Sequence, residues 1–174
     1  HEGYPGHHVY NVLLEKKLVD SLGWKEFSVY PLFSPQSLIA EGSANYGIDV
    51  AFPGTERIIY EKQVLFPLAG LNVSQADRYY MILGLMDKLS YAANEAARKY
   101  LDGEITREDC VKYLEKYSLS APDRALQRTR FFDQYRSYTI NYNLGKDIVA
   151  RYVVMSGGTA DQPEKRWLVF KDLL

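Results

Sequence analysis

Apolar residues recur at helical spacing along almost the whole chain, in segments that begin at capping residues and end at glycine or proline. The clearest segment opens with Ser74-x-x-Asp77, a capping box, and keeps its apolar residues three or four positions apart until Gly103 stops it. No stretch alternates apolar and polar residues as a half-buried strand would. The pattern predicts an all-α fold of about eight helices.

Short turns separate the predicted helices, and no linker or repeat divides the chain. We therefore expect a single domain over residues 1–174, and 47% apolar with 14% aromatic residues is enough to build its core. The predicted helices cover residues 7–22, 36–52, 56–68, 74–102, 106–117, 120–133, 139–156 and a final segment capped by Asp161.

Charge and cysteine content exclude several classes of partner. The formal net charge is −1, with 21 basic and 22 acidic residues mixed along the chain. There is no basic stripe for nucleic acid and no polybasic anchor or long apolar run for a membrane. Cys110 is the only cysteine, which rules out an internal disulfide and favours a reducing, cytoplasmic compartment.

All three histidines lie within the first eight residues, which read His1-Glu2-Gly3-Tyr4-Pro5-Gly6-His7-His8. Imidazoles are the commonest ligands of transition metals, and a carboxylate beside the metal is the usual base of a zinc hydrolase. The spacing differs from the helical H-E-x-x-H motif, because Pro5 occupies the position of the second histidine. On a regular helix His8 would lie about 10 Å along the axis from His1, and His7 would face away. A metal site therefore requires the backbone to break before His7, which Pro5-Gly6 favours.

Glu41 is the best candidate for a further ligand. It lies in an otherwise small and apolar segment, Leu38-Ile39-Ala40-Glu41-Gly42-Ser43-Ala44-Asn45-Tyr46. Two antiparallel helices would return it to the histidines, and the small residues after it would let the backbones approach. The alternatives are a solvated glutamate and surface histidines at an ordinary Pro-Gly turn.

These motifs resemble the bacterial family catalogued as domain of unknown function 885, which is itself similar to the carboxypeptidase Taq type of zinc metallopeptidase among the gluzincins. Ser43 departs from the family, which has tryptophan there, and residues 91–103 lack its Asp-x-Gly-x-His stretch. The likeness is carried by His-Glu-x-x-Pro-Gly-His-His, by Glu-Gly-x-x-x-Tyr from Glu41, by Arg136-Ser137-Tyr138 and by Tyr142-Asn143-Leu144-Gly145-Lys146.

The resemblance implies a multi-helix, zincin-like fold that binds one Zn²⁺ and hydrolyses peptide bonds, with a carboxypeptidase as one form. His1, His7 and Glu41 would bind the metal, and His8 stays open as the alternative to His7. Glu2 would be the general base. Manganese or cobalt could occupy the same ligands.

Residues near the C-terminus would complete the site. Tyr142, or else Tyr138, would donate to the oxyanion, and Arg136 would pair with a substrate carboxylate. Family members are longer, so the resemblance implies that this chain follows an N-terminal helical region. Two alternatives remain. The first is a metal-binding helical domain that is either inactive or a hydrolase that does not act on peptides. The second is an interaction module whose histidines have no functional role.

Overall fold

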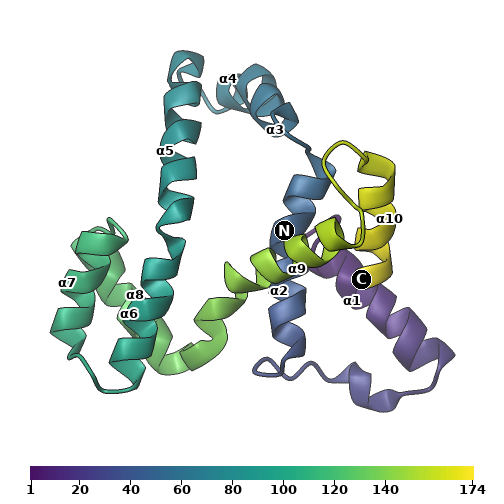
Figure 1. Ribbon diagram of the computed structural model, residues 1–174, viewed down its shortest axis with the longest axis horizontal. Coiled ribbons are helices and arrows are strands. Elements are labelled where there is room, and N and C mark those ends of the chain that lie inside the picture. Colours follow the sequence, from purple (N-terminus) through teal and green to yellow (C-terminus); the bar gives the residue numbers. More distant parts are fainter. The chain divides into compact units, whose positions relative to one another are not determined.

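The computed structural model describes residues 1–174 and consists of helices joined by turns, with no β-strand (Figure 1). The predicted all-α class is confirmed. The chain forms two compact units: unit 1 comprises residues 1–57 and 141–174, and unit 2 comprises residues 58–140. Unit 2 is thus inserted within the sequence of unit 1. The sequence at the two boundaries does not have the composition of a linker. None of the helices has both the length and the apolar character needed to cross a bilayer.

Unit 1 is built from helices at the two ends of the chain. Its first helix begins at His7 and continues from α-helical into π-helical geometry without a break. The elements are α1 (His7–Leu14), the π-helical η1 (Glu15–Ser21), the 3₁₀ turn η2 (Lys25–Ser28), α2 (Gln36–Ala51), α9 (Leu144–Met155) and α10 (Pro163–Leu173).

The backbones of α2 and α9 approach each other closely because glycine occupies the contact on both sides. A Cβ on Gly42 would collide with the carbonyl oxygen of Gly145. One on Gly145 would lie 2.5 Å from the carbonyl oxygen of Leu38. An ion pair between Lys146 Nζ and Asp49 Oδ2, 2.9 Å apart, also joins the two helices. The contact with α9 therefore explains the glycine at position 42 of α2.

The core of unit 1 lies where α2, α9 and α10 meet. Phe170 is fully buried and meets the ring of Tyr46 at a centroid distance of 6.0 Å. Val50, Val149 and Val153 fill the space beside them. Burial of such side chains stabilises a fold by about 1.5–3 kcal/mol each. This cluster holds the C-terminal helices against the helix that carries Glu41.

Unit 2 has its own core of small and aromatic residues. The thiol of Cys110 is buried there, and burial raises its pKa to about 11. Its elements are α3 (Glu56–Tyr60, which begins in unit 1), η3 (Glu61–Leu65), α4 (Phe66–Leu68), η4 (Val73–Gln75), α5 (Ala76–Lys88), α6 (Ser90–Leu101), α7 (Arg107–Tyr117), α8 (Pro122–Tyr135) and η5 (Arg136–Asn141, which ends in unit 1). The core residues are Ala96, Ala97, Cys110, Leu114, Ala125 and Phe132.

The single long helix predicted over residues 74–102 is wrong, because the chain turns at Leu89 between α5 and α6. Neither glycine nor proline marks this turn, and the apolar stripe continues through it. Ala96 and Ala97 in α6 are buried in the core of unit 2, whereas α5 buries only Ala76. The apolar periodicity runs through both α5 and α6, and the two helices differ in that α6 packs into the core of unit 2.

Capping residues were predicted with mixed success. Thr106 caps α7 as expected, since its Oγ1 accepts a hydrogen bond from the amide of Asp109 at 3.1 Å. Ser74 does not cap, because Asn72 Oδ1 accepts from both its amide and its hydroxyl, at 2.9 and 2.8 Å. Asn72 is therefore the cap of the turn that leads into α5.

Two further helices begin at proline rather than after the predicted caps. Pro122 and Pro163 open α8 and α10, where the fixed φ of proline suits the first helical position and its missing amide is not needed. Ser120 and Asp161 lie just outside these helices. The helix predicted from residue 139 begins at Leu144, because residues before it form the 3₁₀ turn η5.

We expect Gly42→Ala to lower the free energy of unfolding by about 1–3 kcal/mol, because the methyl group forces α2 and α9 apart. Urea denaturation followed by circular dichroism measures the change. Gly84→Ala is the control: this helical glycine of α5 has open space around it, so alanine should stabilise the protein by up to about 1 kcal/mol. Equal unfolding midpoints for Gly42→Ala and the unmodified protein would contradict the close contact.

Candidate metal centre

Residues 1–6 fold back on the start of α1. The amide of His7 donates to the carbonyl of His1 at 2.9 Å, and the amide of His8 donates to the carbonyl of Glu2 at 3.0 Å. A Cβ on Gly6 would collide with the carbonyl oxygen of His1, so only glycine fits at this crossing. The predicted backbone break before His7 is confirmed. It brings the side chains of His1 and His7 together although six positions separate them.

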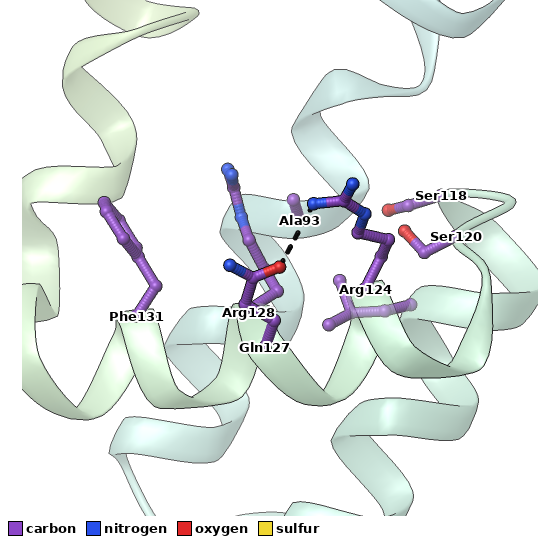
Figure 2. Close-up of a pocket in the computed structure, with 8 residues that line it drawn as sticks. Ala93, Ser118, Ser120, Arg124, Gln127, Arg128 and Phe131 are labelled. Atoms are coloured by element: carbon purple, nitrogen blue, oxygen red, sulfur yellow. Dashed lines mark hydrogen bonds between the residues drawn. The ribbon is translucent and has the colours of Figure 1, made fainter.

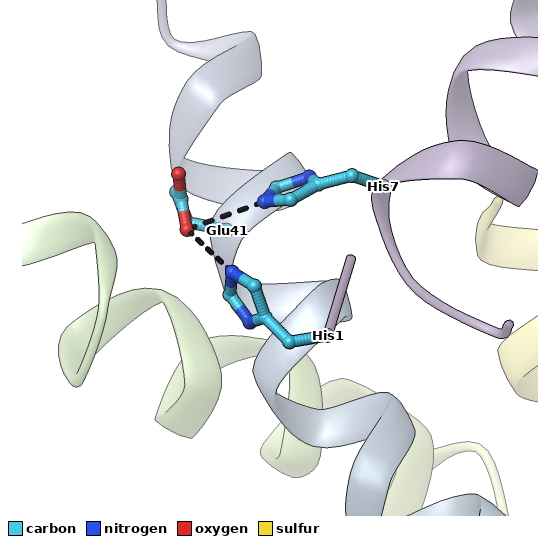
Figure 3. A group of neighbouring side chains, drawn as sticks. All are labelled: His1, His7 and Glu41. Carbon is cyan, nitrogen blue, oxygen red and sulfur yellow. Dashed lines mark ion pairs between the residues drawn. The ribbon is translucent and has the colours of Figure 1, made fainter. Parts of the chain in front are cut away.

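His1, His7 and Glu41 converge on one point (Figure 3). The Nε2 atoms of His1 and His7 lie 3.4 and 3.5 Å from Glu41 Oε2, and the two rings meet edge to face with their centroids 4.7 Å apart. One ligand atom from each of the three residues lies within 4.8 Å of the others. His8 is exposed and outside this group. The three residues could therefore hold a metal ion.

The two nitrogen–oxygen distances suit ligands of a common ion better than direct hydrogen bonds. A charge-assisted N–H···O bond is about 2.7–2.9 Å long. Ligands bound tetrahedrally at about 2.0–2.1 Å from an ion are separated by about 3.4 Å. The observed 3.4 and 3.5 Å match the second spacing. These two distances are therefore compatible with His1, His7 and Glu41 sharing one metal ion.

Asn45 determines which nitrogen of His1 carries the proton. Its Nδ2 donates to the carbonyl oxygen of Tyr142 at 3.1 Å, and a carbonyl can only accept. Asn45 Oδ1 must then face His1, where it accepts from Nδ1 at 3.1 Å. The neutral ring of His1 therefore presents the lone pair of Nε2 toward the carboxylate of Glu41. Two acceptors that face each other in this way favour a cation between them.

Burial makes the site asymmetric. The side chain of Glu41 is 9% exposed, whereas those of His1 and His7 are 26% and 22% exposed. A buried carboxylate strongly favours a compensating cation, because removing its charge from water is costly. The ligand set is thus anchored in α2 and opens to solvent on the histidine side.

Glu2 lies beside the ligand group without belonging to it. Its Oε1 is 3.9 Å from His1 Nε2, and its side chain is 85% exposed. This distance is too long for a hydrogen bond to the imidazole. The carboxylate is therefore open to solvent next to the three converging side chains.

The residues expected near the C-terminus are distributed between the two units. Tyr142 belongs to unit 1, where its carbonyl accepts from Asn45. Arg136 and Tyr138 belong to unit 2; the arginine is exposed, and Tyr138 is buried with its ring 6.2 Å from that of Tyr135. Of these three residues, only Tyr142 shares a unit with the ligand group.

Asn45 is the residue of the site to which no role was assigned from sequence. Its position four residues after Glu41 places it on the same face of α2, which is the signal that could have identified it. An outer residue that hydrogen-bonds the second nitrogen of a ligating histidine fixes the orientation of that ring. Asn45 is positioned to act in this way on His1.

Comparison of the chain with protein-family models, with curated proteins and with solved structures finds no match. The family likeness therefore depends on the motifs described above.

We expect metal-free protein at about pH 8.5, where imidazoles are neutral, to hold His1 in the Nδ1–H tautomer. Long-range ¹H–¹⁵N spectra of the imidazole ring measure the tautomer directly. Asn45→Ala should release the ring to both tautomers, and Asn11→Ala, an exposed change on α1, should leave it unaffected. An Nε2–H tautomer in the unmodified protein would contradict the arrangement of Asn45 and His1.

Proposed function

We propose that this chain is the catalytic part of a zinc metallopeptidase. The observation that carries the proposal is the spacing of 3.4 and 3.5 Å between the two imidazole nitrogens and Glu41 Oε2. The position of the Glu2 carboxylate, 3.9 Å from His1 Nε2, supports hydrolysis over simple metal storage. The motifs shared with the metallopeptidase-like family support the same conclusion.

The donor set favours zinc in a catalytic rather than a structural role. Two imidazoles and one carboxylate are ligands that zinc accepts, and three protein ligands leave one coordination position open. Manganese and cobalt bind similar sets of ligands, so the supply of each metal ion would decide which of the three occupies the site. Zinc bound there supplies Lewis acidity, which polarises a carbonyl group and lowers the pKa of water to about 7.

The protein's own groups would divide the remaining work. Glu2 takes a proton from the attacking water at its exposed carboxylate and delivers it to the leaving amine. Asn45 keeps the Nε2 lone pair of His1 directed at the ligand group through its two hydrogen bonds. Glu41, buried in α2, supplies the fixed negative charge.

The exopeptidase form of the proposal follows from the family resemblance. Tyr142, which belongs to the same unit as His1, His7 and Glu41, is the preferred donor to the tetrahedral oxyanion. An N-terminal helical region, as in longer family members, would contribute further walls of the substrate cleft.

A metal-binding domain without peptidase activity is the second candidate. The exposure of Glu2, at 85%, favours it, because a general base is usually held more firmly against its substrate.

We expect the chelator-treated protein to take up one equivalent of Zn²⁺, measured by calorimetry and elemental analysis. His7→Ala and Glu41→Gln should weaken binding by more than about 100-fold, since each removes a ligand, and Asn45→Ala by about 10–100-fold. His8→Ala is the matched control and should bind as the unmodified protein does. Loss of zinc in His8→Ala but not in His7→Ala would reverse the ligand assignment.

We expect Glu2→Gln to keep its zinc and to lower kcat for peptide hydrolysis by about 10²–10⁴-fold, because the amide cannot accept a proton. Mass spectrometry of a peptide mixture incubated with zinc-loaded protein measures cleavage and shows whether it begins at the C-terminus. Glu15→Gln, an exposed change in η1, should remain fully active. Undiminished cleavage by Glu2→Gln would refute the mechanism, and no cleavage by any form would favour the second candidate.

A further inference from the structure

Unit 2 contains a cavity of about 410 Å³ beside α8, next to the turn that joins α7 to α8 (Figure 2). Two arginines of α8, Arg124 and Arg128, line it, and the serines of the preceding turn, Ser118 and Ser120, lie at one end. No residue of the cavity belongs to the metal centre.

The two guanidinium groups lie on one face of α8, because their positions differ by four. Like charges at this spacing destabilise a helix unless something offsets them. Arg124 donates to the amide oxygen of Gln127 at 3.2 Å and forms no ion pair with a carboxylate. Its charge is therefore available to an anion that enters the cavity.

Arg128 is held in a fixed orientation. Its guanidinium carbon lies 5.4 Å from the ring centroid of Phe131 and 5.8 Å from that of Phe132, and its Nη2 donates to Thr139 Oγ1 at 3.4 Å. Stacking on aromatic rings leaves the edge of a guanidinium plane able to donate. Arg128 thus lines the cavity with its guanidinium held by these contacts, so the side chain would lose little conformational freedom on binding an anion.

The serine end of the cavity supplies a buried hydroxyl. Ser118 Oγ is inaccessible to solvent and has no hydrogen-bond partner in the protein. A buried polar group left in this condition is unfavourable, and a ligand oxygen would supply the missing hydrogen bond. The adjacent first turn of α8 has no side-chain cap, so its amides add partial positive charge.

The cavity also has an apolar wall. It consists of Ala93 and the buried Leu114, together with Phe131, which follows Arg128 on α8. An inorganic anion would leave this wall in contact with water, whereas a ligand with an apolar group next to its anion would cover it.

We propose that this cavity binds a small organic oxyanion, with its carboxylate or phosphate group on Arg124, Arg128 and Ser118 and an aromatic or apolar body against Leu114 and Phe131. The two arginines provide the forked donors that such groups prefer. The proposal is independent of zinc binding and of peptidase activity.

Titration of ¹⁵N-labelled protein with phenyl phosphate, with phenylacetate and with inorganic phosphate tests the proposal. The amides of Ser118, Ser120 and Arg124 should shift on addition of at least one organic probe, and the tighter of the two identifies the preferred anion. Inorganic phosphate should bind at least about tenfold more weakly, because it leaves the apolar wall uncovered. No shift with either organic probe, or equal affinity for inorganic phosphate, would overturn the proposal.

Arginine variants of α8 show whether anions bind in this cavity or are only attracted by the positive charge of the helix. Arg124→Gln and Arg128→Gln should each weaken binding by about tenfold or more, because each removes a charge-assisted hydrogen bond. Arg130→Gln makes the same charge change at an exposed position of α8 outside the cavity and should have no effect.

Ser118→Ala keeps the charge of the cavity and removes only the buried hydroxyl. It should weaken binding without lowering the unfolding midpoint, since that hydroxyl has no partner in the ligand-free protein. Equal weakening by Arg130→Gln and Arg124→Gln, or unchanged affinity in Ser118→Ala, would refute the site.

Discussion

At Gly42 and Gly145 the backbones of α2 and α9 approach so closely that neither position has room for a side chain. Glu41 is the residue before this contact, and Asn45, one turn later on α2, reaches the carbonyl of Tyr142 just before α9. Asn45 hydrogen-bonds both Tyr142 and His1, so the distance between α2 and α9 determines whether its side chain can make both bonds. A wider spacing would break that bridge and release the imidazole, so the orientation of a ligand depends on a contact between two glycines.

The two candidate sites have opposite chemical imbalances. In unit 1, two imidazole nitrogens and a buried carboxylate oxygen converge, so acceptors are in excess and a cation would balance them. In unit 2, two guanidinium groups and a buried hydroxyl line one cavity, so positive charge gathers there and an anion would balance it. In each site, neighbouring residues hold these groups in place. Gly6 allows the backbone to cross next to His1 in unit 1, and the rings of Phe131 and Phe132 hold Arg128 in unit 2.

Local signals in the sequence predicted part of what local backbone geometry determines. Pro5-Gly6 indicated the break that brings His1 to His7, and Thr106 indicated the start of α7. Features that depend on distant partners were not predictable in this way. The turn at Leu89 follows from how α6 packs, and nothing near Asn45 in the sequence shows that Tyr142 lies beside it.

The insertion of unit 2 has a consequence for the order in which unit 1 can form. All three converging side chains come from the first 41 residues, but α9, which supports them, follows the inserted unit. During synthesis the nascent chain would carry all three side chains of the candidate metal centre long before α9 emerges to pack against α2. Joining the two parts across a long insertion adds little entropy cost, because that cost grows only with the logarithm of loop length. The insertion therefore delays the completion of unit 1 without supplying any of these three side chains.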